Sequence, residues 1–188
     1  MIFRHLTPAD YKAMPWANGR GTTLELFRRE DAEGALLLRL SRADVVEAGA
    51  FSSLPGLDRI LTLIEGEGFD LDFGAHGAVA PVLPFVPVAF SGDWPCAAER
   101  VRGPSRDFNV MVARGRLRAD VAVLRDGMAV VDRMAETFIY VVDGWVSVNS
   151  PEYSRRVIAN ELLVIERETA PALSIEVSGF ALKVGVAV

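Results

Sequence analysis

The chain has few of the side chains that commonly bind transition metals or form covalent cross-links. Its 188 residues include two histidines, His5 and His76, and a single cysteine, Cys96. One cysteine excludes a disulfide or a thiolate metal cluster within the chain, and the histidines lack the His-x-His or Glu-x-x-His spacing of metal sites. The sequence therefore predicts a fold held by packing alone, with no bound metal or other cofactor, and a Cys96 that is buried as a small apolar residue.

Long apolar runs and an excess of positive charge are also missing. No stretch reaches the roughly 18 consecutive apolar residues of a membrane helix, and the segment Met1–Trp16 lacks the continuous apolar run of a secretory signal. The formal net charge is −5, whereas a nucleic-acid groove needs clustered excess cations. We therefore expect a cytoplasmic protein that binds neither membranes nor nucleic acid.

The sequence is rich in short β-type segments. Runs of Val, Ile, Leu and Phe recur between Gly, Pro and Asp, and 51% of the residues are hydrophobic. Helical periodicity is rare: we predict one helical turn, with Thr7 as its N-cap, that runs through Tyr11 to Met14 and ends at Pro15. About a dozen strands are too many for one open sheet and indicate an all-β sandwich or barrel.

Two segments of the chain resemble each other. Residues 59–73 and 137–149 each contain an apolar strand, an acidic-Gly pair and an alternating strand, which predicts tight hairpins at Glu65-Gly66 and Asp143-Gly144. This repetition suggests an internal duplication. We expect two halves, 1–115 and 116–188, that meet near Gly115 and pack as a single unit.

Four clusters of polar residues could line a pocket in the first half. The first cluster begins at Trp16 and Asn18 and continues through a Gly-Arg-Gly turn to Thr22, Thr23 and Glu25. Its glycines would let the backbone approach a ligand, and its side chains supply hydrogen-bond donors and acceptors. A glycine-rich turn that simply leads into a strand explains the same pattern.

Two further clusters lie on predicted strands. Alternation places Arg39 and Ser41 on one face of a strand, and Asp107, Asn109 and Met111 on one face of another. An arginine that points into a barrel needs a carboxylate partner, either from the protein or from a ligand. On a strand that faces water, the same residues need no partner.

The remaining cluster surrounds a turn. Phe51 and Ser52 precede a Pro-Gly turn, and Asp58 and Arg59 follow it, immediately before an apolar strand. These residues could bind a ligand, or they could brace the turn.

Taken in this order, the four clusters resemble the HutD/Ves family. Its pattern is Trp-x-Asn-Gly-Gly-Gly-x-Thr-x-Glu, then Arg-x-Ser, Phe-Ser-x-x-Pro-Gly-x-Asp-Arg and Asp-x-Asn-x-Met, which this chain matches from about Trp16 to Arg114. The resemblance implies an all-β, cupin-like jelly roll, a double-stranded β-barrel in a bicupin arrangement within one chain. Arg20 stands where the family has the middle glycine of its triplet, and it adds bulk and charge beside the proposed pocket.

The resemblance also implies a link to histidine utilisation. The first hypothesis is a non-catalytic protein that binds a small polar or carboxylate metabolite of that pathway, such as formylglutamate, in a regulatory or governor role. Arg39 and Arg59 would attract the carboxylate. The residues expected to bind the ligand are Trp16, Asn18, Thr22, Thr23, Glu25, Arg39, Ser41, Phe51, Ser52, Asp58, Arg59, Asp107, Asn109 and Met111.

Two other functions stay open at this point. A metal-independent cupin enzyme, an isomerase or a hydrolase, would use Glu25, Asp58 or Asp107 as a general acid or base. An interaction protein would use the barrel to form a homodimer. The sequence shows no paired base and nucleophile, so binding without catalysis is the first hypothesis.

Overall fold

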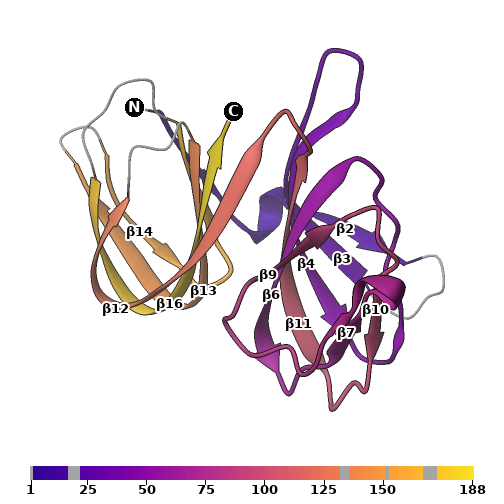
Figure 1. Cartoon of the computed structure of the whole chain (residues 1–188). Coiled ribbons are helices and arrows are strands. Elements are labelled where there is room, and N and C mark those ends of the chain that lie inside the picture. Colours follow the sequence, from indigo (N-terminus) through magenta and orange to yellow (C-terminus); the bar gives the residue numbers. More distant parts are fainter. Residues whose placement is uncertain (1, 17–21, 132–135, 151–152, 167–172) are drawn as a thin grey trace. The chain divides into compact units, whose positions relative to one another are not determined.

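The computed structural model describes residues 2–16, 22–131, 136–150, 153–166 and 173–188, and nearly all of its elements are β-strands (Figure 1). Contacts divide the chain into two compact units. The middle unit comprises Lys12–Leu117, and the C-terminal unit comprises Arg118–Val188 together with the residues up to Tyr11. The prediction of an all-β protein is confirmed. The junction at Leu117 lies close to the expected one at Gly115, but the N-terminal residues group with the second half and not with the first.

The middle unit contains two antiparallel sheets. The larger sheet has the strand order β2 (Lys12–Pro15), β3 (Thr22–Glu30), β4 (Leu36–Val45), β11 (Ser105–Ala113), β6 (Leu57–Gly66) and β9 (Val88–Ser91). The smaller sheet has the order β5 (Gly49–Ala50), β10 (Ala97–Glu99), β7 (Asp70–Asp72) and β8 (Ala78–Val79).

Apolar residues from both sheets form the core of the middle unit. Leu61 and Leu63 lie on one face of β6 and pack with Leu71 of β7 and Phe90 of β9. Cys96 belongs to the same cluster, and burial raises the pKa of its thiol to about 11. The prediction that Cys96 is buried among apolar residues is therefore confirmed.

The C-terminal unit is built on one sheet. Its strand order is β1 (Ile2–Leu6), β15 (Leu162–Glu166), β13 (Glu136–Asn149), β16 (Leu173–Ala187) and β12 (Arg118–Val131), with β14 (Ser154–Ile158) paired to β13. Because β1 pairs antiparallel with β15, the N-terminal residues belong to this unit. A buried cluster of the unit consists of Val, Ile, Leu and Ala side chains.

Both predicted hairpins are wrong. Strand β6 pairs with β11 and β9, whereas β7 pairs with β10 and β8; the pair Asp143-Gly144 lies inside the single strand β13. Gly66 and Gly144 have positive φ, and a Cβ on them would lie 2.2 Å from the Pro104 carbonyl oxygen and 2.1 Å from that of Ser178. These glycines therefore allow another chain segment to approach closely near β-bulges. In the sequence, such a glycine cannot be distinguished from the glycine of a tight turn.

The predicted helical turn is confirmed only at its start. Pro8–Asp10 forms a short 3-10 helix (η1), and the Asp10 carboxylate accepts hydrogen bonds from the Thr7 backbone N–H at 2.8 Å and from the Thr7 hydroxyl at 3.0 Å. Lys12–Pro15 is the strand β2, not helix, because these residues pair with β3. Pro15 is tolerated there because β2 is at the edge of its sheet.

The close approach at Gly66 predicts a large loss of stability on substitution. Gly34 also has positive φ, but a Cβ there would meet no atom within 4 Å. We expect Gly34→Ala to cost about 1–2 kcal/mol of unfolding free energy from backbone strain, and Gly66→Ala to cost at least about 3 kcal/mol because the neighbouring backbone must also move. Urea denaturation of both variants measures the difference, and equal losses would show that the contact with Pro104 is unimportant.

Candidate functional site

A cavity of about 460 Å³ lies in the middle unit, between strands β2, β3, β4, β11 and β6 and the segment Ala50–Leu54. This volume is typical of sites that enclose a small molecule. Nine of the predicted ligand-binding residues line it: Trp16, Thr23, Arg39, Ser41, Phe51, Ser52, Arg59, Asn109 and Met111. The sequence clusters therefore converge on one concave space.

Strand register explains why these residues meet. Strand β11 pairs with β4 on one side and β6 on the other, so Met111 is the cross-strand partner of both Arg39 and Arg59. Asn109, two residues before Met111 on β11, is opposite Ser41 of β4. Since side chains of directly opposed residues point to the same face, the two rows present their side chains to the cavity together.

Arg59 is a buried cation at the wall of the cavity. It is 4% exposed, and its guanidinium donates hydrogen bonds to the Asn109 Oδ1 atom at 3.1 Å and to the Ser52 carbonyl oxygen at 3.4 Å. Its Cζ atom lies 4.9 Å from the ring centroid of Phe90, while its Nε atom has no hydrogen-bond partner. Burial lowers the pKa of Arg59, but a guanidinium still keeps its charge at neutral pH. No carboxylate of the described residues lies within ion-pair distance of it.

Asp107 lies behind Asn109 and is fully buried. The Asn109 side-chain amide donates a hydrogen bond to Asp107 Oδ1, and Asp107 Oδ2 has no hydrogen-bond partner. Burial raises the pKa of Asp107 to about 7, against the opposing effects of the Arg59 charge and the Asn109 hydrogen bond. Near neutral pH this carboxyl group is therefore partly protonated.

Arg39, the second arginine of the cavity, has a carboxylate partner. Its Nε atom lies 2.9 Å from Glu25 Oε2, a close ion pair without hydrogen-bond geometry, and its Nη2 atom donates to the Met14 sulfur at 3.4 Å. Arg28 approaches the same carboxylate oxygen at 3.5 Å. Burial lowers the pKa of Arg39, and the Glu25 charge opposes that effect. The charge of Arg39 is thus largely compensated within the protein.

Trp16 is held by a hydrogen bond to the neighbouring strand. Its indole Nε1–H donates to the Thr23 Oγ1 atom at 2.9 Å, and both residues line the cavity. Thr22, the residue before Thr23 on β3, is exposed and does not line the cavity. Asn18 lies outside the described residues.

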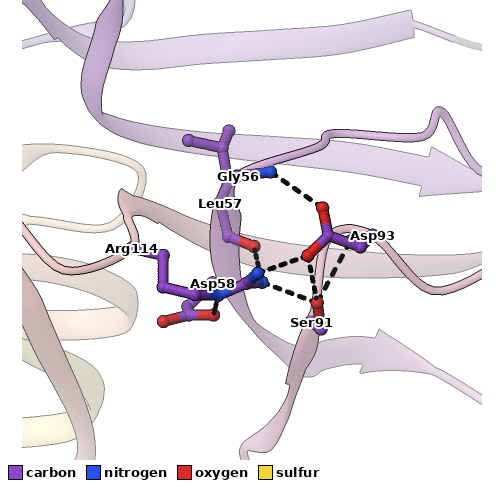
Figure 2. Close-up of polar contacts among 6 residues, drawn as sticks. All are labelled: Gly56, Leu57, Asp58, Ser91, Asp93 and Arg114. Carbon is purple, nitrogen blue, oxygen red and sulfur yellow. Dashed lines mark hydrogen bonds and ion pairs between the residues drawn. The ribbon is translucent and has the colours of Figure 1, made fainter.

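Asp58 is outside the cavity and braces the turn before β6. Figure 2 shows Arg114 donating to Asp58 Oδ1 at 2.7 Å, to the Leu57 carbonyl oxygen at 2.9 Å and to Ser91 Oγ at 2.6 Å. Asp93 accepts hydrogen bonds from Arg114 and, at 2.9 Å, from the Gly56 N–H, and chiefly the Arg114 contact lowers the pKa of Asp93 to about 2. Asp58 faces away from the cavity because it neighbours the inward-facing Arg59 on a strand.

Two other predicted residues lie beside the cavity without lining it: Glu25, which pairs with Arg39, and Asp107, which lies behind Asn109. Five residues that line the cavity were missed: Met14, Pro15, Ala43, Ala50 and Leu54. Alternation along β4 would have found Ala43, which shares a face with Arg39 and Ser41. The others are small or apolar residues that carry no sequence signal for a pocket.

Among the described residues, no cluster of three or more His, Cys, Asp or Glu side chains has the arrangement of a metal site. In the same part of the chain, no helix is long and apolar enough to cross a membrane.

Comparison with known proteins identifies the family of the chain. The sequence profile of HutD matches residues 8–182. The chain belongs to the HutD family. This HutD-family protein is 40% identical to an uncharacterized 21.2 kDa protein of the hutC 3′ region in Pseudomonas putida. The match covers 116 residues, which are 61% of this chain and 60% of that protein. It is 35% identical to protein Ves of Cronobacter sakazakii over 72% of this chain and 75% of that protein. The resemblance to the HutD/Ves family is therefore confirmed.

Solved structures show the same fold. HutD of Pseudomonas fluorescens SBW25 is 27% identical over 98% of both chains, with a TM-score of 0.86, and a conserved protein of unknown function from Pseudomonas aeruginosa PAO1 is 28% identical over both whole chains, with a TM-score of 0.89. The Escherichia coli pirin YhhW matches 97% of both chains at 12% identity and a TM-score of 0.68. Such neighbours confirm the cupin-like fold of this HutD-family chain, while barrel closure and the bicupin arrangement stay predictions.

The burial of Asp107 predicts a pH-dependent stability. Its folded pKa of about 7 exceeds the ordinary aspartate pKa of 3.8, so the folded state holds this proton more tightly than the unfolded state. The stabilisation is present below about pH 4 and is lost as the pH rises to about 7, by up to about 4 kcal/mol. We expect Asp107→Asn to flatten the stability profile between pH 4 and 7. Denaturation at several pH values measures the profile; an unchanged slope in Asp107→Asn, or the same flattening in the control Asp120→Asn at an exposed carboxylate, would contradict the assignment.

Proposed function

We propose that the protein binds a small carboxylate in the cavity of the middle unit and acts as a non-catalytic receptor in histidine degradation, with N-formylglutamate as the candidate ligand. The observation that carries this proposal is Arg59, a buried guanidinium without a carboxylate partner among the described residues. A buried charge is costly unless it is paired, so a ligand carboxylate would compensate the site. Trp16, Phe51 and Met111 supply an apolar lining for the rest of the ligand.

The relatives support this choice of ligand class. One relative belongs to the hutC 3′ region of Pseudomonas putida, and HutD of Pseudomonas fluorescens was solved in a formate condition. Formate is the smallest carboxylate, and formylglutamate carries carboxylates on a longer chain. The chemistry of both agrees with a site built around a buried guanidinium.

Catalysis by a buried carboxylate has less support than binding. The three candidates for a general acid or base, Glu25, Asp58 and Asp107, are not among the residues that line the cavity. A general acid or base must come within hydrogen-bond reach of the reacting atom or act through one water. Asn109 stands between Asp107 and the cavity, and Asp58 is bound to Arg114. A binding role agrees better with this arrangement.

The proposal predicts stabilisation by carboxylates that depends on Arg59. Millimolar formate or N-formyl-L-glutamate should raise the Tm of the wild-type protein, because a ligand that binds only the folded state stabilises it by about 1.4 kcal/mol at ten times its Kd. We expect Arg59→Met to abolish this rise. Arg100→Met is the matched control, because the Arg100 side chain is 78% exposed and lies outside the cavity.

Thermal unfolding with and without each ligand makes the measurement, and circular dichroism checks that the variants fold. The proposal fails if neither carboxylate raises the Tm of the wild-type protein. It fails equally if Arg59→Met keeps the full rise, since the carboxylate would then bind elsewhere.

A further inference from the structure

The two arginines of the cavity differ in charge compensation. Arg59 has only neutral hydrogen-bond acceptors, the Asn109 amide oxygen and the Ser52 carbonyl oxygen. Arg39 has the Glu25 carboxylate at 2.9 Å. One end of the cavity is therefore cationic, while the other end presents a guanidinium whose charge is already balanced. A carboxylate would therefore bind more favourably at the Arg59 end than at the Arg39 end.

The neutral end offers hydrogen bonds in both directions. The Ser41 side chain is 1% exposed, lines the cavity and has no hydrogen-bond partner for its hydroxyl. It follows Arg39 on the same face of β4, so a hydroxyl and a guanidinium lie next to each other there. A hydroxyl both donates and accepts, whereas a guanidinium only donates.

The backbone sets the two ends apart. Arg39 and Arg59 lie in one row across β4, β11 and β6, with Met111 between them. Their backbones are thus two strand spacings apart, about 10 Å. The apolar Met111 side chain lies between the two polar ends, as a short hydrocarbon chain of a ligand requires.

We propose that the cavity binds one carboxylate of its ligand at Arg59 and prefers a neutral amide to a second carboxylate at the Arg39 end. The carboxylate pairs with Arg59. The amide oxygen accepts a hydrogen bond from Arg39, and the amide N–H donates one to Ser41 Oγ. A second carboxylate at the Arg39 end would approach a guanidinium already paired with Glu25, and the negative charge of Glu25 would repel it. The inference rests on the proposed function and states which group of the ligand lies at the Arg39 end; in N-formylglutamate, which has two carboxylates, the formamide would lie there and one carboxylate would pair with Arg59.

Asp107 determines the conditions for a test. Its carboxyl lies behind Asn109, and when ionised it partly offsets the Arg59 charge. Burial raises the pKa of Asp107 to about 7, with Asp44 acting in the same direction and Arg59 in the opposite one. At pH 6 Asp107 is mainly protonated, so the cationic end keeps its charge.

The test compares two ligands of equal length, glutaramate and glutarate, which differ only in an amide that replaces one carboxylate. Isothermal titration calorimetry at pH 6 with formate, glutaramate and glutarate measures the three affinities. We expect glutaramate to bind at least about tenfold more tightly than glutarate, equivalent to 1.4 kcal/mol. Binding of glutarate as tight as that of glutaramate, or tighter, overturns the inference.

Glu25→Gln tests the cause of the preference. Removing the Glu25 charge leaves Arg39 uncompensated, so glutarate should gain affinity and the ratio should fall at least about threefold. Glu30→Gln is the matched control, because Glu30 is 42% exposed and pairs with Arg28 instead of Arg39; its ratio should stay that of the wild type. An unchanged ratio in Glu25→Gln overturns the inference, and if that variant does not fold, the wild-type ratio decides alone.

The outcomes separate this inference from the proposed function. If formate binds but glutarate equals or exceeds glutaramate, the amide preference is wrong and the carboxylate receptor stands. If none of the three ligands binds the wild-type protein, the proposed function is wrong and the amide preference falls with it.

Discussion

The antiparallel pairing of β11 with both β4 and β6 decides which side chains reach the cavity. This register places Arg39, Met111 and Arg59 in one row, and Ser41 and Asn109 in the next. A shift of either pairing by one residue would turn each row to the opposite face of the sheet. The site therefore depends on backbone hydrogen bonds made by residues that need not touch a ligand.

The cavity concentrates charge among side chains that are buried or half-buried. Two arginines and two carboxylates lie at or just behind its wall, and the two arginines differ in their partners. Glu25 balances Arg39 directly, whereas Asn109 separates Asp107 from Arg59. Because an uncompensated buried charge is costly, this asymmetry marks Arg59 as the point where an anion would gain most. In the C-terminal unit the buried cluster consists of Val, Ile, Leu and Ala side chains.

Much of the site could be predicted because strands alternate. Residues two apart, such as Arg39 and Ser41, or Asn109 and Met111, reach the same cavity, as expected. The same rule excludes one of any two neighbours, and applying it strictly would have removed Asp58 and Thr22. Alternation does not predict whether a side chain on the correct face reaches the cavity. Asp107 is on that face but lies behind Asn109 and does not line the cavity.

The strand connections were harder to predict. An acidic-Gly pair fits a tight turn, but it equally fits a bulge where a glycine passes close to another carbonyl, as at Gly66 and Gly144. Only the distant partner, Pro104 or Ser178, distinguishes these cases, and the local sequence does not contain it. The place of β1 was missed for the same reason, because its partner β15 is far along the chain.

That pairing has a consequence for how the protein is made. Strand β1 precedes the middle unit in the sequence and leaves the ribosome before it, whereas its partner β15 follows the middle unit and emerges after it. The middle unit, by contrast, is one continuous stretch, Lys12–Leu117, and is complete while the C-terminal strands are still being synthesised. During translation the backbone hydrogen bonds between β1 and β15 therefore form only after the middle unit has been synthesised.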